Sequence, residues 1–193
     1  KTAINRCEPA KLDELLHPVF NKEALAKAKE LTRGLPASPG AACGQIVFFA
    51  EDAAKWRADG HKVVLVRIET SPEDLAGMAA AEGILTARGG MTSHAAVVAR
   101  GMGKCCVSGA GAINVDYKAK TLEIDGVKLQ EGDFISLNGT NGRVYQGEIR
   151  TQAAELSGDF ADLMDLCAKY TRLQVRTNAD TPHDAAIARS FGA

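Results

Sequence analysis

The sequence of 193 residues lacks several features that would mark a specialised class of protein. Its 23 basic and 24 acidic residues nearly cancel, so it has no broad basic face of the kind used to bind nucleic acid or anionic membranes. It has no apolar run long enough to span a bilayer, and its first residues lack the apolar core of a signal peptide. These absences predict a cytoplasmic protein that binds neither nucleic acid nor a membrane.

The cysteines also lack a recognisable pattern. There are five of them, Cys7, Cys43, Cys105, Cys106 and Cys167. An odd number without CxxC spacing argues against a disulfide framework and against a zinc ribbon, so we expect reduced thiols and no metal. One alternative stays open, a metal or redox site formed by His94 with Cys105 or Cys106 and with Cys43. Adjacent residues of a strand point to opposite faces, so at most one of the adjacent pair could join His94.

Glycine and proline divide the chain into three parts. Residues 1–35 show helical patterns over 9–17 and 22–33, and we interpret them as a helical linker. Residues 36–150 form the main domain. Residues 151–193 return to helical periodicity over 151–172 and then show a strand at 173–179 that leads into a helix.

Within the main domain, apolar runs typical of strands alternate with helical patterns, which indicates an α/β layer architecture. The expected strands are 45–50, 62–67, 83–87 and 105–109, and the expected helices are near 51–58, 72–81 and 93–100. Residues 121–149 instead contain repeated Asp-Gly and Asn-Gly turn signals, so an antiparallel portion is predicted beside the α/β part.

The stretch "GGMTSHAAVVARG", residues 89–101, contains the histidine with the most unusual surroundings. The two glycines permit a turn after the strand at 83–87, and Thr92 or Ser93 can cap the helix that follows. His94 then falls in the first helical turn. The alanines and valines behind it are apolar around the whole helix, which predicts a buried helix whose amino end lies at the surface.

A helix amino end carries unpaired N–H groups and a partial positive charge, which favour an anion and disfavour imidazolium. We therefore expect a neutral, nucleophilic His94. If it attacked a phosphoryl group, the N–H groups and the hydroxyls of Thr92 and Ser93 could bind the phosphoryl oxygens, while Gly90 would allow a close approach to the backbone. A histidine after a Gly-Gly turn is also often a surface or capping residue, so the residues alone leave both interpretations open.

Known phosphate-binding motifs are not matched, and the acidic stretch after residue 68 has a structural interpretation. The histidine stretch matches neither the GxGxxG nor the P-loop pattern. In "ETSPEDLAGM" the acidic residues Glu73 and Asp74 follow Ser71 and Pro72, as expected for a capped helix start rather than a catalytic pair of carboxylates.

Residues 83–109, "GILTARGGMTSHAAVVARGMGKCCVSG", resemble nearly throughout the phosphohistidine segment of the pyruvate, phosphate dikinase family of PEP-utilising enzymes. The stretches "LPASPGAACGQIVF" and "NGTNGRVYQGE" resemble the opening and the close of the same domain, so the close resemblance covers residues 36–150. Phosphoenolpyruvate synthase and enzyme I of the sugar phosphotransferase system share the Gly-Gly-x-Thr-x-His core and are the alternatives. The details "MTSH" and "GKCCVSG" favour the dikinase.

The resemblance implies a swivelling β/β/α phosphohistidine domain with flanking helical linkers. Members of the family convert ATP, phosphate and pyruvate into AMP, pyrophosphate and phosphoenolpyruvate, reversibly and with magnesium. The histidine that matches His94 carries the phosphoryl group on Nε2. Thr92 matches a threonine that is phosphorylated for regulation in plant members, where the added negative charge would repel the phosphoryl donor.

Partners are implied in the same way. The domain would carry the phosphoryl group between a nucleotide-binding domain and a PEP/pyruvate-binding barrel, which would hold the magnesium, in a homodimeric parent enzyme. The sequence shows no nucleotide-binding segment, and residues 151–193 resemble a linker and the truncated start of the barrel. We therefore expect a carrier that does not complete the reaction alone, and poor order or altered packing over 173–193.

Overall fold

In the computed structural model, the described residues are 2–8, 12, 16–152, 158–173, 176, 179 and 181–190. The chain forms two compact units, one of residues 10–155 and one of residues 1–9 with 156–193. The described elements of the second unit are α1 (Thr2–Arg6), α7 (Asp159–Ala168) and α8 (Pro182–Ser190). In the part of the chain that the structure describes, no helix is both long and apolar enough to cross a membrane.

The larger unit is built on an eight-stranded sheet with the order β2-β12-β11-β4-β5-β6-β7-β3. Its four parallel strands are β4 (Ala41–Val47), β5 (Val63–Arg67), β6 (Gly83–Thr86) and β7 (Cys105–Ser108). Its antiparallel strands are β2 (Glu30–Arg33), β3 (Leu35–Ser38), β11 (Phe134–Asn138) and β12 (Arg143–Gln146).

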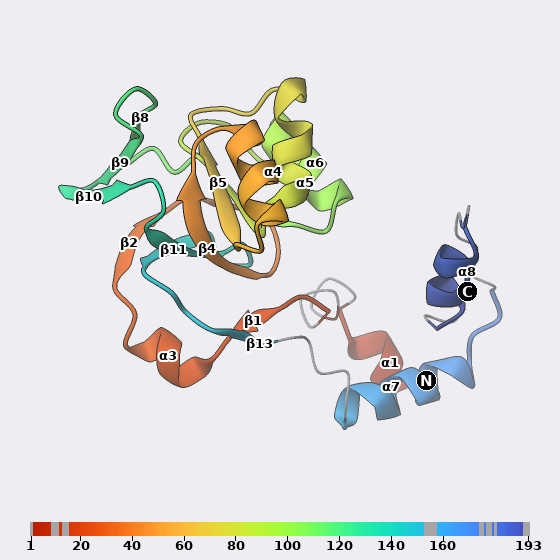
Figure 1. The fold of residues 1–193 in the computed structure, drawn as a ribbon. Coiled ribbons are helices and arrows are strands. Elements are labelled where there is room, and N and C mark those ends of the chain that lie inside the picture. The colour runs from red at the N-terminus through yellow and green to blue at the C-terminus, as the bar shows by residue number, and fades with distance from the viewer. Residues whose placement is uncertain are drawn as a thin grey trace. The chain divides into compact units, whose positions relative to one another are not determined.

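Two further layers cover this sheet. The helices α4 (Ala50–Ala58), α5 (Leu75–Ala80), which follows the 3-10 turn η1 (Pro72–Asp74), and α6 (His94–Gly101) lie together on one side (Figure 1). A three-stranded antiparallel sheet is formed by β8 (Ile113–Asp116), β9 (Thr121–Ile124) and β10 (Val127–Gln130). The result is a mixed α/β fold with the predicted β/β/α layers.

Alternate residues of β5 show why the sheet needs both layers. Val64 and Val66 belong to the apolar cluster that contains Leu122 of the small sheet. Leu65, between them, belongs to the cluster that contains Met78 of α5. The side chains of Val64, Leu65 and Val66 are all fully buried. Because successive side chains of a strand point to opposite faces, a continuous apolar run is expected only for a strand that is covered on both faces.

The central elements confirm the sequence-based expectations, and the amino-terminal segment does not. The helix expected over 22–33 is wrong, because α3 ends early (Lys22–Ala26) and residues 30–33 form β2. In that strand Thr32 pairs with Val144 of β12, and Leu31 is buried in the core. Pairing and burial outweigh the helical propensity of this lysine- and alanine-rich segment.

One expected strand has other bounds in the structure, and two expected elements are largely undescribed. The strand expected at 45–50 begins and ends earlier, as β4 at 41–47. The residues expected as the helix 9–17 and the strand 173–179 lie largely outside the described residues. The helix expected after 181 is confirmed as α8, and the expected order of 173–193 stays a prediction.

The chain comes into and leaves the larger unit at one place. The two-residue strands β1 (Val19–Phe20) and β13 (Thr151–Gln152) pair antiparallel with each other. The carbonyl of Pro18 accepts a hydrogen bond from the amide of Ala41 at 2.8 Å, which fixes this pair beside the start of β4.

Close contact between α4 and α5 depends on Gly77. A Cβ atom at Gly77 would lie 2.4 Å from Cα of Ala50, whereas a Cβ at Gly101, in α6, would meet nothing within 4 Å. We predict that Gly77→Ala lowers the free energy of unfolding by about 1–3 kcal/mol. The matched Gly101→Ala change should leave it unchanged or raise it by up to about 1 kcal/mol. Urea denaturation of both variants measures the difference, and equal effects would contradict this account of the helix contact.

Candidate functional site

His94 is the first residue of α6 and follows the loop that leaves the carboxyl end of β6. The hydroxyl of Ser93 caps the helix by accepting a hydrogen bond from the amide of Ala96 at 3.3 Å. The predicted helix start is confirmed, with Ser93 and not Thr92 as the cap. The burial expected around the whole helix is wrong, because the side chain of Val97 is 56% exposed.

Hydrogen bonds hold the loop that precedes His94. Thr86 at the end of β6 donates a hydrogen bond to the hydroxyl of Ser108 at 3.1 Å, and this hydroxyl lies 3.3 Å from that of Ser93. The guanidinium of Arg100 donates to the carbonyls of Met91 and Ala96. The cap is therefore anchored to the buried ends of β6 and β7.

Gly89 is the position where the loop requires glycine. Its φ angle is +108°, in the region that side chains rarely adopt. A Cβ atom there would also lie 3.0 Å from the hydroxyl oxygen of Ser108 and 2.9 Å from Cβ of Ser93. Gly89 thus lets the loop close tightly over the serine pair.

Thr70 holds the imidazole ring. Its hydroxyl lies 3.1 Å from Nδ1 of His94, in a partly buried contact between residues 24 positions apart. For Nε2 of His94, the described part of the chain offers no hydrogen-bond partner. If Nδ1 carries the proton and donates it to the Thr70 oxygen, Nε2 keeps a free lone pair. In that tautomer Nε2 is the nitrogen that can react.

The segment that carries Thr70 is itself fixed. The amide of Ser71 donates a hydrogen bond to Asp74 Oδ2 at 2.8 Å, and Arg67 forms an ion pair with Asp74 Oδ1 at 3.4 Å. The amide of Ile68 donates to the hydroxyl of Tyr117 at 2.8 Å. The expected capped helix start is confirmed, since Pro72 opens the turn and Asp74 closes it onto Ser71. These contacts keep the Thr70 hydroxyl in place beside the ring.

A hollow of about 310 Å³ opens in front of His94. Its lining residues are Glu69, Thr70, Arg88, Gly89, Ser93, His94 and Ala95. Arg88 and Glu69 face each other across 3.9 Å, with side chains 74% and 63% exposed. The hollow therefore combines a held imidazole, a helix amino end and one cation, which is an arrangement suited to an anionic reactant.

The residues singled out from the sequence are only partly brought together. His94 and Ser93 line the hollow, whereas Thr92 is exposed in the preceding turn and, like Gly90, does not line it. A Cβ atom at Gly90 would meet nothing within 4 Å, so none of the described residues requires glycine there. The sequence reasoning missed Thr70 and Arg88. The only local signal for either was position, because each follows the carboxyl end of a predicted strand.

The rival site of His94 with cysteines has little support in the geometry. Cys105 lies in the cluster shared with the small sheet and Cys106 in the cluster shared with the helices, on opposite faces as expected. Burial raises the pKa of each of these thiols to about 12, so neither readily becomes the thiolate that binds metals. In the described part of the chain no group of three or more His, Cys, Asp or Glu residues could hold a metal ion.

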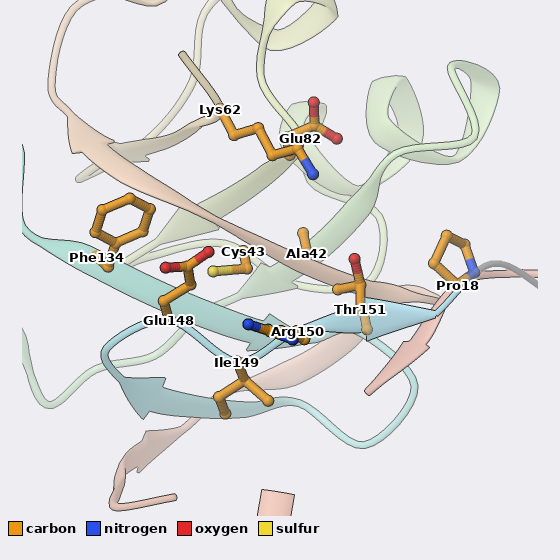
Figure 2. A pocket seen from close by; sticks show the side chains of 11 residues that line it. Pro18, Ala42, Cys43, Lys62, Glu82, Phe134, Glu148, Ile149, Arg150 and Thr151 are labelled. Atoms are coloured by element: carbon orange, nitrogen blue, oxygen red, sulfur yellow. The ribbon is translucent and has the colours of Figure 1, made fainter. Parts of the chain in front are cut away.

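Cys43 lines a second hollow, of about 230 Å³, at the opposite edge of the parallel sheet. Lys62 and Glu82, which precede β5 and β6, lie on one side of it, and Glu148 and Arg150 lie on the other, with Cys43 between them (Figure 2). Burial raises the pKa of the Cys43 thiol, an effect that hydrogen bonding to Ser136 reduces. This hollow is separate from the His94 site.

Comparison with known proteins agrees with the geometry of the His94 site. Residues 60–142 match the family model described as "PEP-utilising enzyme, mobile domain". This segment contains Thr70, Arg88 and His94. The chain therefore carries the mobile domain of the PEP-utilising enzymes.

Within that class the chain is similar in sequence to pyruvate, phosphate dikinases. That of Clostridium symbiosum is 55% identical over 191 residues, which cover 99% of this chain and 22% of the relative. That of Rhizobium meliloti is 56% identical over 99% of this chain and 21% of the relative. The chloroplastic dikinase 1 of Oryza sativa subsp. japonica is 54% identical over 100% of this chain and 20% of the relative. The chain thus spans about a fifth of the length of these relatives.

A solved structure of an Enzyme I protein aligns with 56% of this chain and 37% of its own, with a TM-score of 0.32 and 24% identity. A TM-score this low does not establish a shared fold.

The raised thiol pKa values give a direct test of the rival site. A thiol with a pKa of about 12 is almost wholly protonated near neutral pH, so we predict that a disulfide reagent leaves Cys105 and Cys106 unmodified in the folded protein. All five cysteines should react after denaturation. Cys167, which is only partly buried in α7, is the internal comparison. Modification of Cys105 or Cys106 at the rate of Cys167, read by peptide mass spectrometry, would contradict the burial argument.

Proposed function

We propose that this domain is the phosphoryl carrier of a pyruvate, phosphate dikinase. His94 accepts a phosphoryl group that derives from ATP in the presence of phosphate and passes it to pyruvate, giving phosphoenolpyruvate, and both transfers are reversible. The observation that supports this most is the contact between Thr70 and Nδ1 of His94, which leaves Nε2 as the free nitrogen beside a hollow suited to an anion. Sequence identity of 53–56% to proteins named as such dikinases supports the choice of reaction.

The proposed chemistry uses the groups of the site in order. The lone pair of Nε2 forms a bond to phosphorus, and the bond from phosphorus to the leaving group breaks with its electron pair. The Nδ1 proton stays on the ring and is shared with the Thr70 oxygen, which stabilises the positive charge that develops on the imidazole. The amino end of α6, capped by Ser93, faces the phosphoryl oxygens with its partial positive charge.

The tethers support a domain that moves as one body. The chain comes in at β1 and leaves at β13, and these strands pair with each other beside the start of β4. His94 lies after the carboxyl end of the parallel strand β6, so it is at the opposite edge of the sheet from the tethers. A small rotation about the paired tethers would therefore displace His94 more than any residue near them, as a carrier between two sites requires.

The proposal also includes partner domains and a regulatory site. Its partners are a nucleotide-binding domain and a PEP/pyruvate-binding barrel of a homodimeric parent enzyme in the cytoplasm, and those domains hold the magnesium. Phosphorylation of the exposed Thr92, two residues before His94, would place negative charge beside the nucleophile and inhibit transfer. The domain boundaries at residues 36 and 150 belong to the same proposal.

Transfer in trans tests the proposal. The donor is ³²P-labelled phosphoenolpyruvate with magnesium, and the helper is a full-length relative whose own matching histidine is replaced by alanine. We expect this chain to gain an acid-labile, base-stable label, and His94→Ala to gain none. Labelling of His94→Ala, or of an aspartate or serine in the unmodified chain, would refute the assignment. The circular dichroism spectrum of His94→Ala should match the parent chain and serves as the folding control.

The role of Thr70 predicts a graded series in the same assay. Thr70→Val keeps the shape of the side chain and removes the hydroxyl, so Nδ1 loses its partner and the labelling rate should fall about 10- to 100-fold. Thr70→Ser keeps the hydroxyl and should stay within a few-fold of the parent rate. Equal rates for valine and serine would show that the hydroxyl does not act on the ring.

A further inference from the structure

Arg88 and Glu69 are placed at the His94 hollow by the backbone rather than by their own side chains. The amide of Arg88 donates a hydrogen bond to the carbonyl of Ile68 at 2.9 Å, and that of Ala87 donates to Arg67 at 3.1 Å. The pairing of β5 with β6 thus continues past the ends of both strands. It sets Glu69 opposite Arg88 on one rim of the hollow, next to Thr70, while both charged side chains stay largely exposed.

The ion pair between them is weak enough to be exchanged. At 3.9 Å and with both side chains more than half exposed, it is of the kind that contributes little to stability. A phosphoryl group with up to two negative charges offers three acceptor oxygens to the planar guanidinium, which binds such groups through paired hydrogen bonds. The interaction of Arg88 with a phosphoryl group is therefore stronger than its ion pair with Glu69.

The charge balance of the hollow also favours a move of Arg88 from Glu69 to the phosphoryl group. Among its described lining residues Arg88 is the only cation and Glu69 the only acid. With Arg88 paired to Glu69 the resting hollow is close to neutral. Once a phosphoryl group is attached to Nε2, Glu69 would repel it unless Arg88 stood between them.

We propose that Arg88 is the phosphoryl-binding cation of this site, and that it exchanges Glu69 for the phosphoryl group when His94 becomes phosphorylated. The proposal rests on the function proposed above and assigns a role within it. Arg88 would draw the anionic donor to Nε2 and neutralise the product. Glu69 would hold Arg88 at the rim in the resting state and compete with the phosphoryl group for it.

The experiment compares an anionic with an uncharged reagent on this chain. Phosphoramidate phosphorylates histidine: the new bond from Nε2 to phosphorus replaces the bond from phosphorus to nitrogen of the reagent, which leaves as ammonia. Diethyl pyrocarbonate acylates the same nitrogen but carries no charge. Rates at His94 are read by mass spectrometry of its peptide in the parent chain and in Arg88→Gln and Glu69→Gln. Arg143→Gln is the matched control, because Arg143 of β12 also forms an exposed ion pair, with Glu30 of β2 at 3.3 Å, and lies outside the hollow.

We expect Arg88→Gln to lower the phosphoramidate rate about tenfold, as for the loss of one charge-assisted hydrogen bond, and Glu69→Gln to raise it about two- to fivefold. Neither change should alter the diethyl pyrocarbonate rate, and Arg143→Gln should alter neither. In ³¹P spectra, the second pKa of the phosphoryl group should be higher in Arg88→Gln than in the parent chain, because a nearby cation favours the dianion.

Three results would overturn the proposal. An Arg88→Gln rate equal to that of Arg143→Gln would show that Arg88 does not meet the phosphoryl group. Equal losses with both reagents would show that Arg88 only shapes the loop. An unshifted phosphoryl pKa would show that no exchange from Glu69 occurs. A parent chain that phosphoramidate labels elsewhere than at His94 would instead contradict the proposed function itself, so the two failures are distinct.

Discussion

The site depends on one constraint, the parallel pairing of β5 with β6 and its continuation into the two loops that follow. This pairing places residues 67 and 68 beside residues 86–88. From these positions Thr70 contacts the ring of His94 and Glu69 pairs with Arg88. The apolar residues of these strands are fully buried between a helical layer and a second sheet. The core therefore fixes the geometry of the site, although none of the core side chains takes part in its chemistry.

The polar groups of the site act by two different physical means. Nδ1 is held by a short, partly buried hydrogen bond that needs accurate geometry, and the bond comes from a segment made rigid by Asp74 and Tyr117. The charged pair of Arg88 and Glu69 at the rim of the hollow is instead exposed and long. A rigid hydrogen bond suits the selection of one imidazole tautomer, because the tautomer must not change. A weak, exposed ion pair suits Arg88, because its guanidinium must be free to bind an incoming phosphoryl group.

Local sequence signals were sufficient for the central elements and for His94. The apolar run at 62–67, the Gly-Gly turn and the serine cap each act within a few residues, so β5 and the start of α6 could be predicted. Strand β2 could not, because its partner Val144 lies more than a hundred positions away and its own residues favour a helix. Thr70 and Arg88 were missed for a similar reason. Each acts on a residue that is close in space and distant in sequence, and a threonine or arginine after a strand carries no signal by itself. The resemblance to a family gave His94 its expected role and gave no indication of the residues that orient it.

The exposure of the site has a consequence for how a carrier must work. A phosphohistidine is open to attack by water, and the residues of this chain leave His94 only half-buried. Met91 in the loop before it and Val97 on α6 expose 42% and 56% of their surface. In the proposed carrier role, water is excluded by the sites that His94 enters and not by the domain itself. The carrier would then contribute only what has to travel: a nitrogen with its tautomer fixed by Thr70, a helix end, and one mobile cation that neutralises the phosphoryl group between the two sites.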